Sequence, residues 1–208
     1  YKRQLGNRLW TLPLRFYIGI LWLIEGLKKL VGEGTWDAAW DALLQKGEFA
    51  FTIGSDSWIK AGNVKMPFEW LYDAVSSASQ AGDAATTFAE PILKEMPNFY
   101  ESIMQIFIPN PDVAVFFQTI VVATEIGIGL ALIAGLFTWL ASAASAFMVI
   151  NFVLSAMAGW DILWFFFGSI ALMNGSGRTF GLDHYVLPWI NKVVGGFWVG
   201  GKGHIYKK

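Results

Sequence analysis

The chain has 208 residues, of which 55% are hydrophobic and only 15% are charged, and its formal net charge is −1. A soluble domain carries roughly 25% charged residues, so this composition favours a lipid environment. Cysteine is absent, which excludes disulfides and cysteine-ligated iron–sulfur clusters in this chain. The histidines, His184 and His204, lie outside the apolar segments, so the paired axial ligands of a membrane haem are not expected.

Four apolar segments predict four membrane-spanning helices. A hydrocarbon core about 30 Å thick needs roughly 20 helical residues, and the first three segments reach that length. The fourth reaches it only if the helix continues past Asn174. A buried core helix is the alternative for any single segment, but Leu140 to Gly159 carries no charge. The predicted spans are residues 9–31, 113–136, 137–158 and 160–178.

The distribution of basic residues predicts the orientation. Nine of the fifteen Lys and Arg residues precede or enter the first span or follow the last, which outweighs Lys28 and Lys29 at the outer end of the first span. The connection 32–112 holds four lysines and twelve of the sixteen acidic residues. Because cytoplasmic loops are enriched in Lys and Arg, both termini are predicted to be cytoplasmic and residues 32–112 to lie outside. Since position 1 is Tyr rather than Met, the chain is interpreted as a piece of a longer protein or as a processed chain.

The connection 32–112 is patterned like short amphipathic helices rather than like a disordered linker. Three sets of apolar residues recur at helical spacing. These are Trp36, Trp40 and Leu43; Phe68, Leu71 and Val75; and Phe99, Ile103 and Ile106. A capping box from Thr87 to Glu90 is expected to begin the third helix. The helices would lay an apolar face on the spans or the lipid, either as the roof of a site or as plain surface cover.

Two acidic residues lie within the predicted spans, where a carboxylate is costly unless it is paired or faces a polar cavity. Glu25 is predicted to pair with Lys29, one helical turn further on. That pair is either a structural contact near the surface or part of a functional site. Glu125 has no basic residue near it in the sequence. It is therefore predicted to find a partner on another helix, to bind a polar ligand or to be protonated.

Small residues on the second span predict a helix–helix contact. Gly127, Ala131 and Gly135 recur at a spacing of four, which would let a neighbouring helix approach closely. Glu125 points away from this stripe, because two residues correspond to about 200° of helical phase.

A second stripe of polar or small residues, Asn151, Ser155 and Gly159, lies on the third span. It is interpreted as an interhelical contact more readily than as a ligand site. Trp160 and Asp161 follow at the outer turn before the fourth span, where the connection 32–112 could cover them. They are weaker candidates for a site.

A glycine-rich turn follows the fourth span and could hold an anion or a cytoplasmic partner. It lacks the strand and the full glycine spacing of a nucleotide-binding fingerprint. Its candidate residues are Gly175, Gly177, Arg178 and Asp183. The tail 185–208 is predicted to include a helix lying in the membrane interface, anchored by Trp189 and Trp198.

Taken in order, these elements resemble the DoxX-like family of small four-span bacterial membrane proteins. The matching elements are Arg15-Phe-Tyr-Ile-Gly19 with Glu25-Gly-Leu-Lys28-Lys29, Glu125-Ile-Gly127 ending in Gly135, and Gly175-Ser-Gly177-Arg178 with Asp183. Members of that family look like membrane partners of respiratory redox enzymes, including a thiosulfate:quinone oxidoreductase. Similar domains follow some bacterial type II NADH dehydrogenases. The resemblance implies a quinone as the ligand and a flavin on a partner, but it carries over no catalytic residues.

The sequence thus predicts an all-α membrane protein, with a bundle of four transmembrane helices and an extracytoplasmic helical insertion, in the bacterial cytoplasmic membrane. The favoured function is a quinone-interacting subunit or domain that anchors a cytoplasmic flavoprotein and passes its electrons to membrane quinone. A non-catalytic scaffold and a small-solute or proton carrier are the alternatives. Oligomerisation stays open, and neither a metal nor a nucleic-acid partner is expected. The candidates for the quinone or proton site are Glu25, Lys29, Glu125, Asn151, Trp160 and Asp161.

Overall fold

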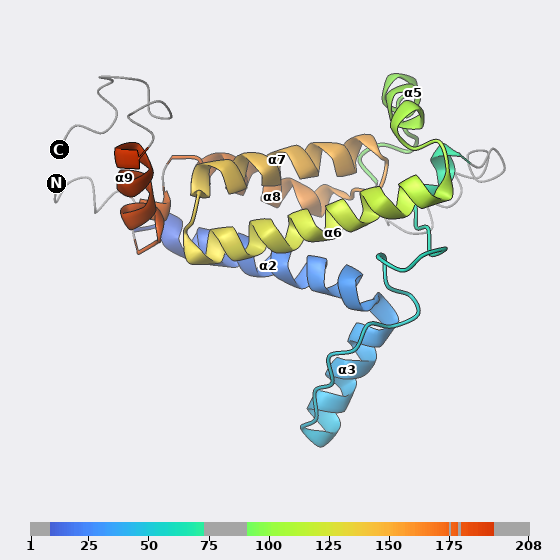
Figure 1. Ribbon diagram of the computed structural model, residues 1–208, viewed down its shortest axis with the longest axis horizontal. Helices are drawn as coiled ribbons and strands as arrows, with labels where there is room; N and C mark the ends of the chain where they lie inside the picture. Colours follow the sequence, from blue (N-terminus) through green and yellow to red (C-terminus); the bar gives the residue numbers. More distant parts are fainter. Residues whose placement is uncertain (1–8, 73–90, 175, 179, 194–208) are drawn as a thin grey trace.

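Four helices lie side by side along the long axis of the computed structural model, which describes residues 9–72, 91–174, 176–178 and 180–193 (Figure 1). They are α2 (Thr11–Val31), α6 (Pro111–Ala134), α7 (Thr138–Leu154) and α8 (Leu163–Leu172). α2 packs mainly on α6 and α7 on α8, while contacts of α6 with α7 and of α2 with α8 close the bundle. The described residues form no strand, so the predicted all-α class is confirmed for them.

The ends of α6 follow local sequence signals. The side chain of Asn110 accepts a hydrogen bond of 3.0 Å from the Val113 N–H, and Pro111 occupies the first helical position. At the other end, Gly135 adopts a left-handed conformation with φ of 65°, which terminates the helix. The helix therefore agrees with the predicted second segment to within two residues at each end.

The third and fourth helices are shorter than the predicted segments. α7 ends at Leu154 rather than at residue 158, because Ala156 takes up a left-handed φ of 58°. α8 ends at Leu172, so the predicted continuation of the fourth helix to residue 178 is wrong. Asn174 and the glycines after it favour a turn over a helix. A separate 3₁₀ turn, η3 (Ser176–Arg178), occupies the end of the predicted segment.

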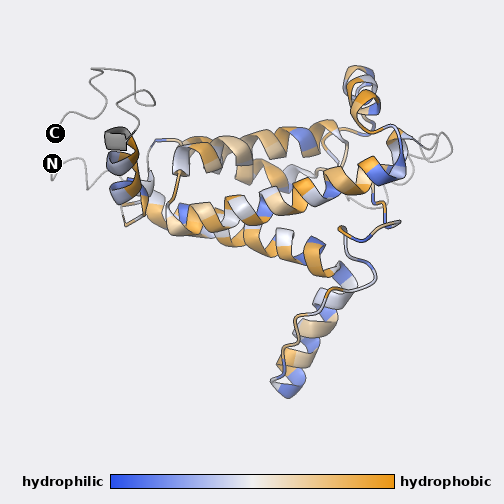
Figure 2. Cartoon of the chain, viewed as in Figure 1, coloured by the Kyte–Doolittle hydropathy of each residue, from blue (hydrophilic) through white to orange (hydrophobic). Residues whose placement is uncertain are grey.

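Within the described residues, α6 is the one helix both long and apolar enough to cross a membrane. α7 and the stretch Trp160–Leu172, which begins with the 3₁₀ turn η2 (Trp160–Ile162), are apolar but shorter. α2 has 21 residues but carries charged side chains in its sequence. Hydrophobic residues predominate along α6, α7 and α8 (Figure 2). The number of spans and their orientation stay predictions.

The close contact between α2 and α6 depends on glycines other than the predicted ones. A Cβ atom at Gly129 would lie 2.7 Å from the Leu23 nitrogen, and one at Gly26 would lie 2.9 Å from the nitrogen of Ile126. Of the predicted contact stripe, Gly127 is wrong, because a Cβ atom there would meet nothing within 4 Å, whereas Ala131 packs against the core. Gly129 lies about 200° around the helix from Gly127, on the face that carries α2.

The insertion forms two of the three predicted amphipathic helices. α3 (Glu33–Lys46) begins directly after α2 and projects away from the bundle (Figure 1). Its buried Trp36 packs against the rings of Trp40 and Phe49. On this face Trp36 therefore contacts Phe49 of the returning chain, while the predicted contact of the face with lipid stays a prediction.

α5 (Asn98–Phe107) confirms the third predicted helix from Phe99 onward, and the side chains of Phe99, Ile103, Ile106 and Phe107 are exposed. Thr87 and Glu90 of the expected capping box lie outside the described residues, as does Val75. The second predicted helix is wrong as far as the structure describes it. Only a 3₁₀ turn, η1 (Glu69–Leu71), forms, and it buries Trp70 and Leu71 against the side of α5 and the start of α6.

α9 (Asp183–Val193) runs across the end of the bundle opposite α3 and α5 (Figure 1). Its Tyr185 and Trp189 side chains are exposed. This helix agrees with the helical part of the predicted tail, while Trp198 lies outside the described residues.

Candidate functional site

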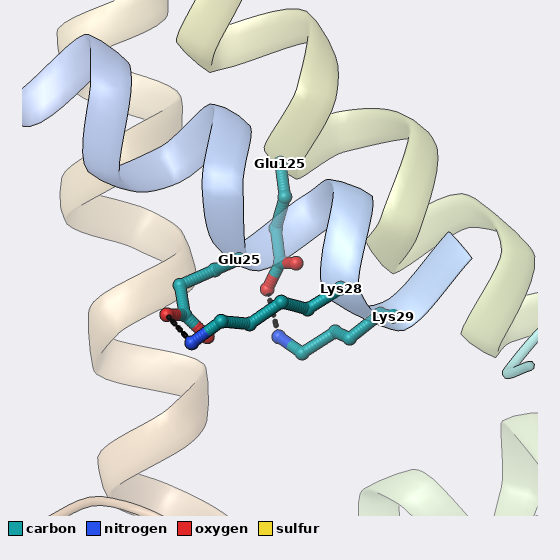
Figure 3. A network of polar contacts seen from close by, with 4 residues as sticks. All are labelled: Glu25, Lys28, Lys29 and Glu125. Carbon is teal, nitrogen blue, oxygen red and sulfur yellow. Dashed lines mark hydrogen bonds and ion pairs between the residues drawn. The ribbon is translucent and has the colours of Figure 1, made fainter. Parts of the chain in front are cut away.

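An ion pair between α2 and α6 is the most deeply buried charged contact that joins two of the bundle helices (Figure 3). Lys29 Nζ donates a hydrogen bond to Oε1 of Glu125. The Glu125 side chain is 0% exposed and that of Lys29 is 14% exposed. Of the three alternatives predicted for Glu125, the structure therefore shows the first, a partner on another helix.

The predicted pair between Glu25 and Lys29 is wrong. Glu25 instead accepts a hydrogen bond of 3.2 Å from Lys28, and both side chains are partly exposed, at 46% and 34%. Lys28 and Lys29 differ by about 100° around α2, so they face different surroundings. Lys29 faces α6, whereas Lys28 stays at the surface beside Glu25 (Figure 3).

The glycine contact between the helices makes the buried pair possible. A Cβ atom at Gly26 would lie 3.1 Å from the Cβ of Glu125, so any larger residue would push α6 away from α2. Removing one partner of such a buried pair typically costs about 3–5 kcal/mol, because the other charge is left uncompensated. Close packing at Gly26 therefore sets the distance over which Lys29 must reach.

Two aromatic rings flank the ammonium group of Lys29. Its Nζ atom lies 5.1 Å from the centre of the Trp58 ring and 4.9 Å from that of Phe152. Both distances are within the range of a cation–π interaction. Phe152 in turn packs against Trp22, with ring centres 6.2 Å apart. The pair thus sits between apolar, flat surfaces.

One oxygen of Glu125 is left without a partner. Its Oε2 atom is buried and accepts no hydrogen bond from the described residues. Buried carboxylate oxygens are normally hydrogen-bonded, so an orphaned one marks a place for a ligand, a water molecule or a proton. The site therefore offers one donor group, Lys29, and one free oxygen, Glu125 Oε2, side by side.

Loop 54–65 covers the end of α2 next to Lys29. The N–H of Gly54 donates to the carbonyl of Val31 at 2.7 Å, and the N–H of Trp58 donates to that of Lys29 at 3.0 Å. The hydroxyl of Ser57 donates to the Leu30 carbonyl at 2.6 Å. These bonds satisfy carbonyl groups that a helix C-terminus leaves unpaired.

Gln118 of α6 holds the other side of this loop, and the sequence analysis missed it. Its side chain is fully buried. Its Nε2 atom donates to the carbonyls of Trp58 and Asn63, at 2.8 and 3.0 Å, and its Oε1 atom accepts from the Lys65 N–H at 2.7 Å. In the sequence, Gln118 stands out only as an uncharged amide in an apolar segment, and this does not indicate which groups it binds.

A second buried polar contact joins α2, α7 and α8. Trp22 Nε1 donates to the Ser145 hydroxyl at 2.7 Å, and this hydroxyl lies 2.6 Å from that of Ser169. Ser142, one turn before Ser145, is buried and its hydroxyl has no partner among the described residues. These residues could not be singled out from the sequence, because serines in apolar segments are common helix–helix contacts.

The other predicted candidates lie apart from the buried pair. Asn151 accepts a hydrogen bond of 3.1 Å from Tyr100 of α5, which agrees with an interhelical contact. Burial raises the pKa of the Tyr100 hydroxyl, which keeps it a donor. Trp160 and Asp161 lie in η2 with exposed side chains.

At the α9 end of the bundle, the predicted anion turn is closely packed. Asp183 accepts hydrogen bonds from the backbone N–H groups of Phe137 and Thr138, at 2.6 and 3.0 Å. The buried Arg15 donates to the carbonyls of Ser176 and Phe180, each at 3.0 Å. Both oxygens of Asp183 are therefore engaged within the protein.

The three other predicted residues of this turn are Gly175, Gly177 and Arg178. A Cβ atom on Gly177 would clash with Asp183 and Thr138, so only glycine fits there. Arg178 is half-buried, and Gly175 lies outside the described residues.

The family model that matches this chain is DoxX, over residues 85–158. The match contains α5, α6 and α7, and with them Glu125 and Asn151. The resemblance to the DoxX-like family is therefore confirmed for this part of the chain. Comparison with curated proteins and with solved structures finds no significant match.

Proposed function

We propose that this chain is a membrane protein that binds a quinone, with Lys29 and Glu125 at the polar end of the site. The observation that carries the proposal is the unpartnered Oε2 atom of Glu125 beside the Lys29 ammonium group. Small-molecule sites are mostly apolar with a few convergent polar groups. Trp58 and Phe152 supply apolar walls about the ammonium group.

The ion pair offers one hydrogen-bond donor and one acceptor, which suit the oxidised quinone and the reduced quinol respectively. The N–H groups of Lys29 can donate to a ring carbonyl, and Oε2 of Glu125 can accept from a ring hydroxyl. When bound, a quinone takes up two electrons, here from the reduced flavin of a partner, together with two protons. Glu125 would hold one of these protons at Oε2 and, on giving it up, become a carboxylate whose charge Lys29 compensates. The second proton, like the two electrons, would come from the reduced flavin, which releases two protons when it is oxidised.

The proposed setting is a bundle of four spans with both termini in the cytoplasm. A cytoplasmic flavoprotein would dock at the end of the bundle that carries α9. Ten residues separate Glu125 from Gly135 at that end of α6, which corresponds to about 15 Å along the helix. Electrons from the partner would cross roughly this depth to reach the site.

Binding of decylubiquinone to the purified chain in phospholipid nanodiscs tests the proposal, with quenching of tryptophan fluorescence as the signal. We expect saturable binding that Lys29→Met and Glu125→Gln each weaken roughly ten- to hundredfold. This range follows from the loss of a hydrogen bond to a charged group, about 1.5–3 kcal/mol. Glu25→Gln is the matched control, because its pair with Lys28 is partly exposed, and it should leave the affinity unchanged.

Two results would contradict the proposal. The wild-type chain could fail to bind decylubiquinone saturably, or all three variants could bind it with the wild-type affinity. Either result would favour the non-catalytic scaffold, in which the buried pair serves only to hold α2 against α6.

A further inference from the structure

We propose that Gln118 is a positioning residue that holds loop 54–65 against the end of α2 and thereby fixes Lys29 in the candidate site. The importance of Lys29 for a ligand rests on the function proposed above, whereas the effect of Gln118 on the loop does not. Gln118 belongs to α6, the helix that also carries Glu125.

All the hydrogen-bonding groups of the Gln118 amide have partners in the loop. Both of its N–H groups and its oxygen bind backbone groups of one loop, at Trp58, Asn63 and Lys65. A buried amide left without these partners would cost free energy, so the loop and the side chain hold each other in place. Apolar side chains of similar size cannot replace these bonds.

The backbone of Trp58 connects the loop to α2. Its carbonyl accepts from Gln118, while its N–H donates to the carbonyl of Lys29 at 3.0 Å. Gly54 and Ser57 bind the next two carbonyls, those of Val31 and Leu30. One residue of the loop, Trp58, therefore links Gln118 of α6 directly to the backbone of Lys29 in α2.

The side chain of Trp58 also contacts the side chain of Lys29. The Trp58 ring lies 5.1 Å from its Nζ atom and forms one wall around it. If the loop leaves α2, the last carbonyls of that helix lose their partners and the ammonium group loses this wall. The side chain of Lys29 could then adopt more conformations, and its ammonium group would be held less firmly beside Glu125.

Hydrogen–deuterium exchange of the full chain in nanodiscs tests the effect on the loop. Gln118→Leu should accelerate exchange roughly ten- to hundredfold in peptides from residues 54–65, because three hydrogen bonds are lost. Peptides from α7 and α8 should exchange at the wild-type rate. Thr119→Val is the matched control, since the Thr119 hydroxyl binds only the Val115 carbonyl of its own helix at 2.9 Å in the described structure.

Gln118→Glu provides a second variant, because it has the same shape and keeps the acceptor for Lys65 but loses both donors. It should give the same local acceleration if Gln118→Leu does not fold. Unchanged exchange in the loop would overturn the proposal. Acceleration spread over every helix, or unfolding of both variants, would also overturn it, because Gln118 would then stabilise the whole bundle.

A double-mutant cycle with decylubiquinone tests the coupling to Lys29. Gln118→Leu should weaken binding about tenfold in the wild-type background and not at all in the Lys29→Met background. Equal weakening in both backgrounds would overturn an action through Lys29. If the wild-type chain does not bind decylubiquinone, the proposed function fails, whereas the exchange experiment still decides whether Gln118 holds the loop.

Discussion

Two glycines on one helix are expected to respond in opposite ways to the same substitution. At Gly129, a Cβ atom would lie 2.7 Å from the nitrogen of Leu23 and 2.8 Å from the carbonyl oxygen of Gly19, and both are backbone atoms of α2. At Gly127, a Cβ atom would meet nothing within 4 Å. We therefore expect Gly129→Ala to destabilise the protein and Gly127→Ala to be neutral or stabilising.

The magnitude follows from the space between the helices. Ordinary contact begins at 3.4 Å, so the added atom at Gly129 lies 0.7 Å too close to Leu23 (3.4 minus 2.7). Backbone atoms cannot rotate away, so α2 and α6 must move apart by roughly that amount. A gap of about 0.5–1 Å forfeits a quarter to a half of each dispersion contact along the interface. Overpacking of this kind costs about 1–3 kcal/mol.

Unfolding by sodium dodecyl sulfate, followed by circular dichroism in a mild detergent, measures both variants. Replacing glycine with alanine inside a helix gains at most about 1 kcal/mol, and less if the unfolded state keeps its helices. The difference in free energy of unfolding between the two variants should therefore be about 1–4 kcal/mol. Equal destabilisation by both substitutions, or no loss of stability for Gly129→Ala, would refute the glycine contact described here.

Two further outcomes are expected. Ser145→Ala should lower the free energy of unfolding by about 1–3 kcal/mol, because it leaves the buried Trp22 N–H without an acceptor, whereas Ser142→Ala should be neutral. The same detergent titration checks this pair, and an equal loss in both variants would contradict it. In intact cells, an impermeant thiol reagent should label Ser55→Cys but not His184→Cys, since both positions are exposed and the distribution of basic residues predicts opposite sides for them. Labelling of His184→Cys alone would reverse the proposed orientation.

Much of the helical architecture is a local property of the sequence. α6 lies within two residues of the predicted segment 113–136, and its ends are set by the Asn110-Pro111 pair and Gly135, because capping and left-handed turns depend on residues within one helical turn. α3 was likewise predictable, because the helical spacing of its apolar residues can be recognised in the sequence without knowing what the helix packs against. Where the prediction failed, as at the end of α8, a continuous apolar composition concealed a turn near Asn174.

The need of Glu125 for a partner on another helix was also predictable, because the cost of burying a carboxylate depends on that residue alone. The identity of the partner was not. Lys28 and Lys29 are neighbours with the same charge, and only the packing of α2 on α6 decides which of them turns inward.

Tertiary structure decided the remaining parts of the site. The approach of α2 to α6 at Gly26 and Gly129 selects Lys29 as the partner of Glu125. Loop 54–65 then brings Trp58 to the same place, held by an amide of Gln118 that is 53 residues from Lys65 in the sequence. Such contacts join segments far apart in the chain, and their geometry depends on how all the elements pack rather than on any local pattern.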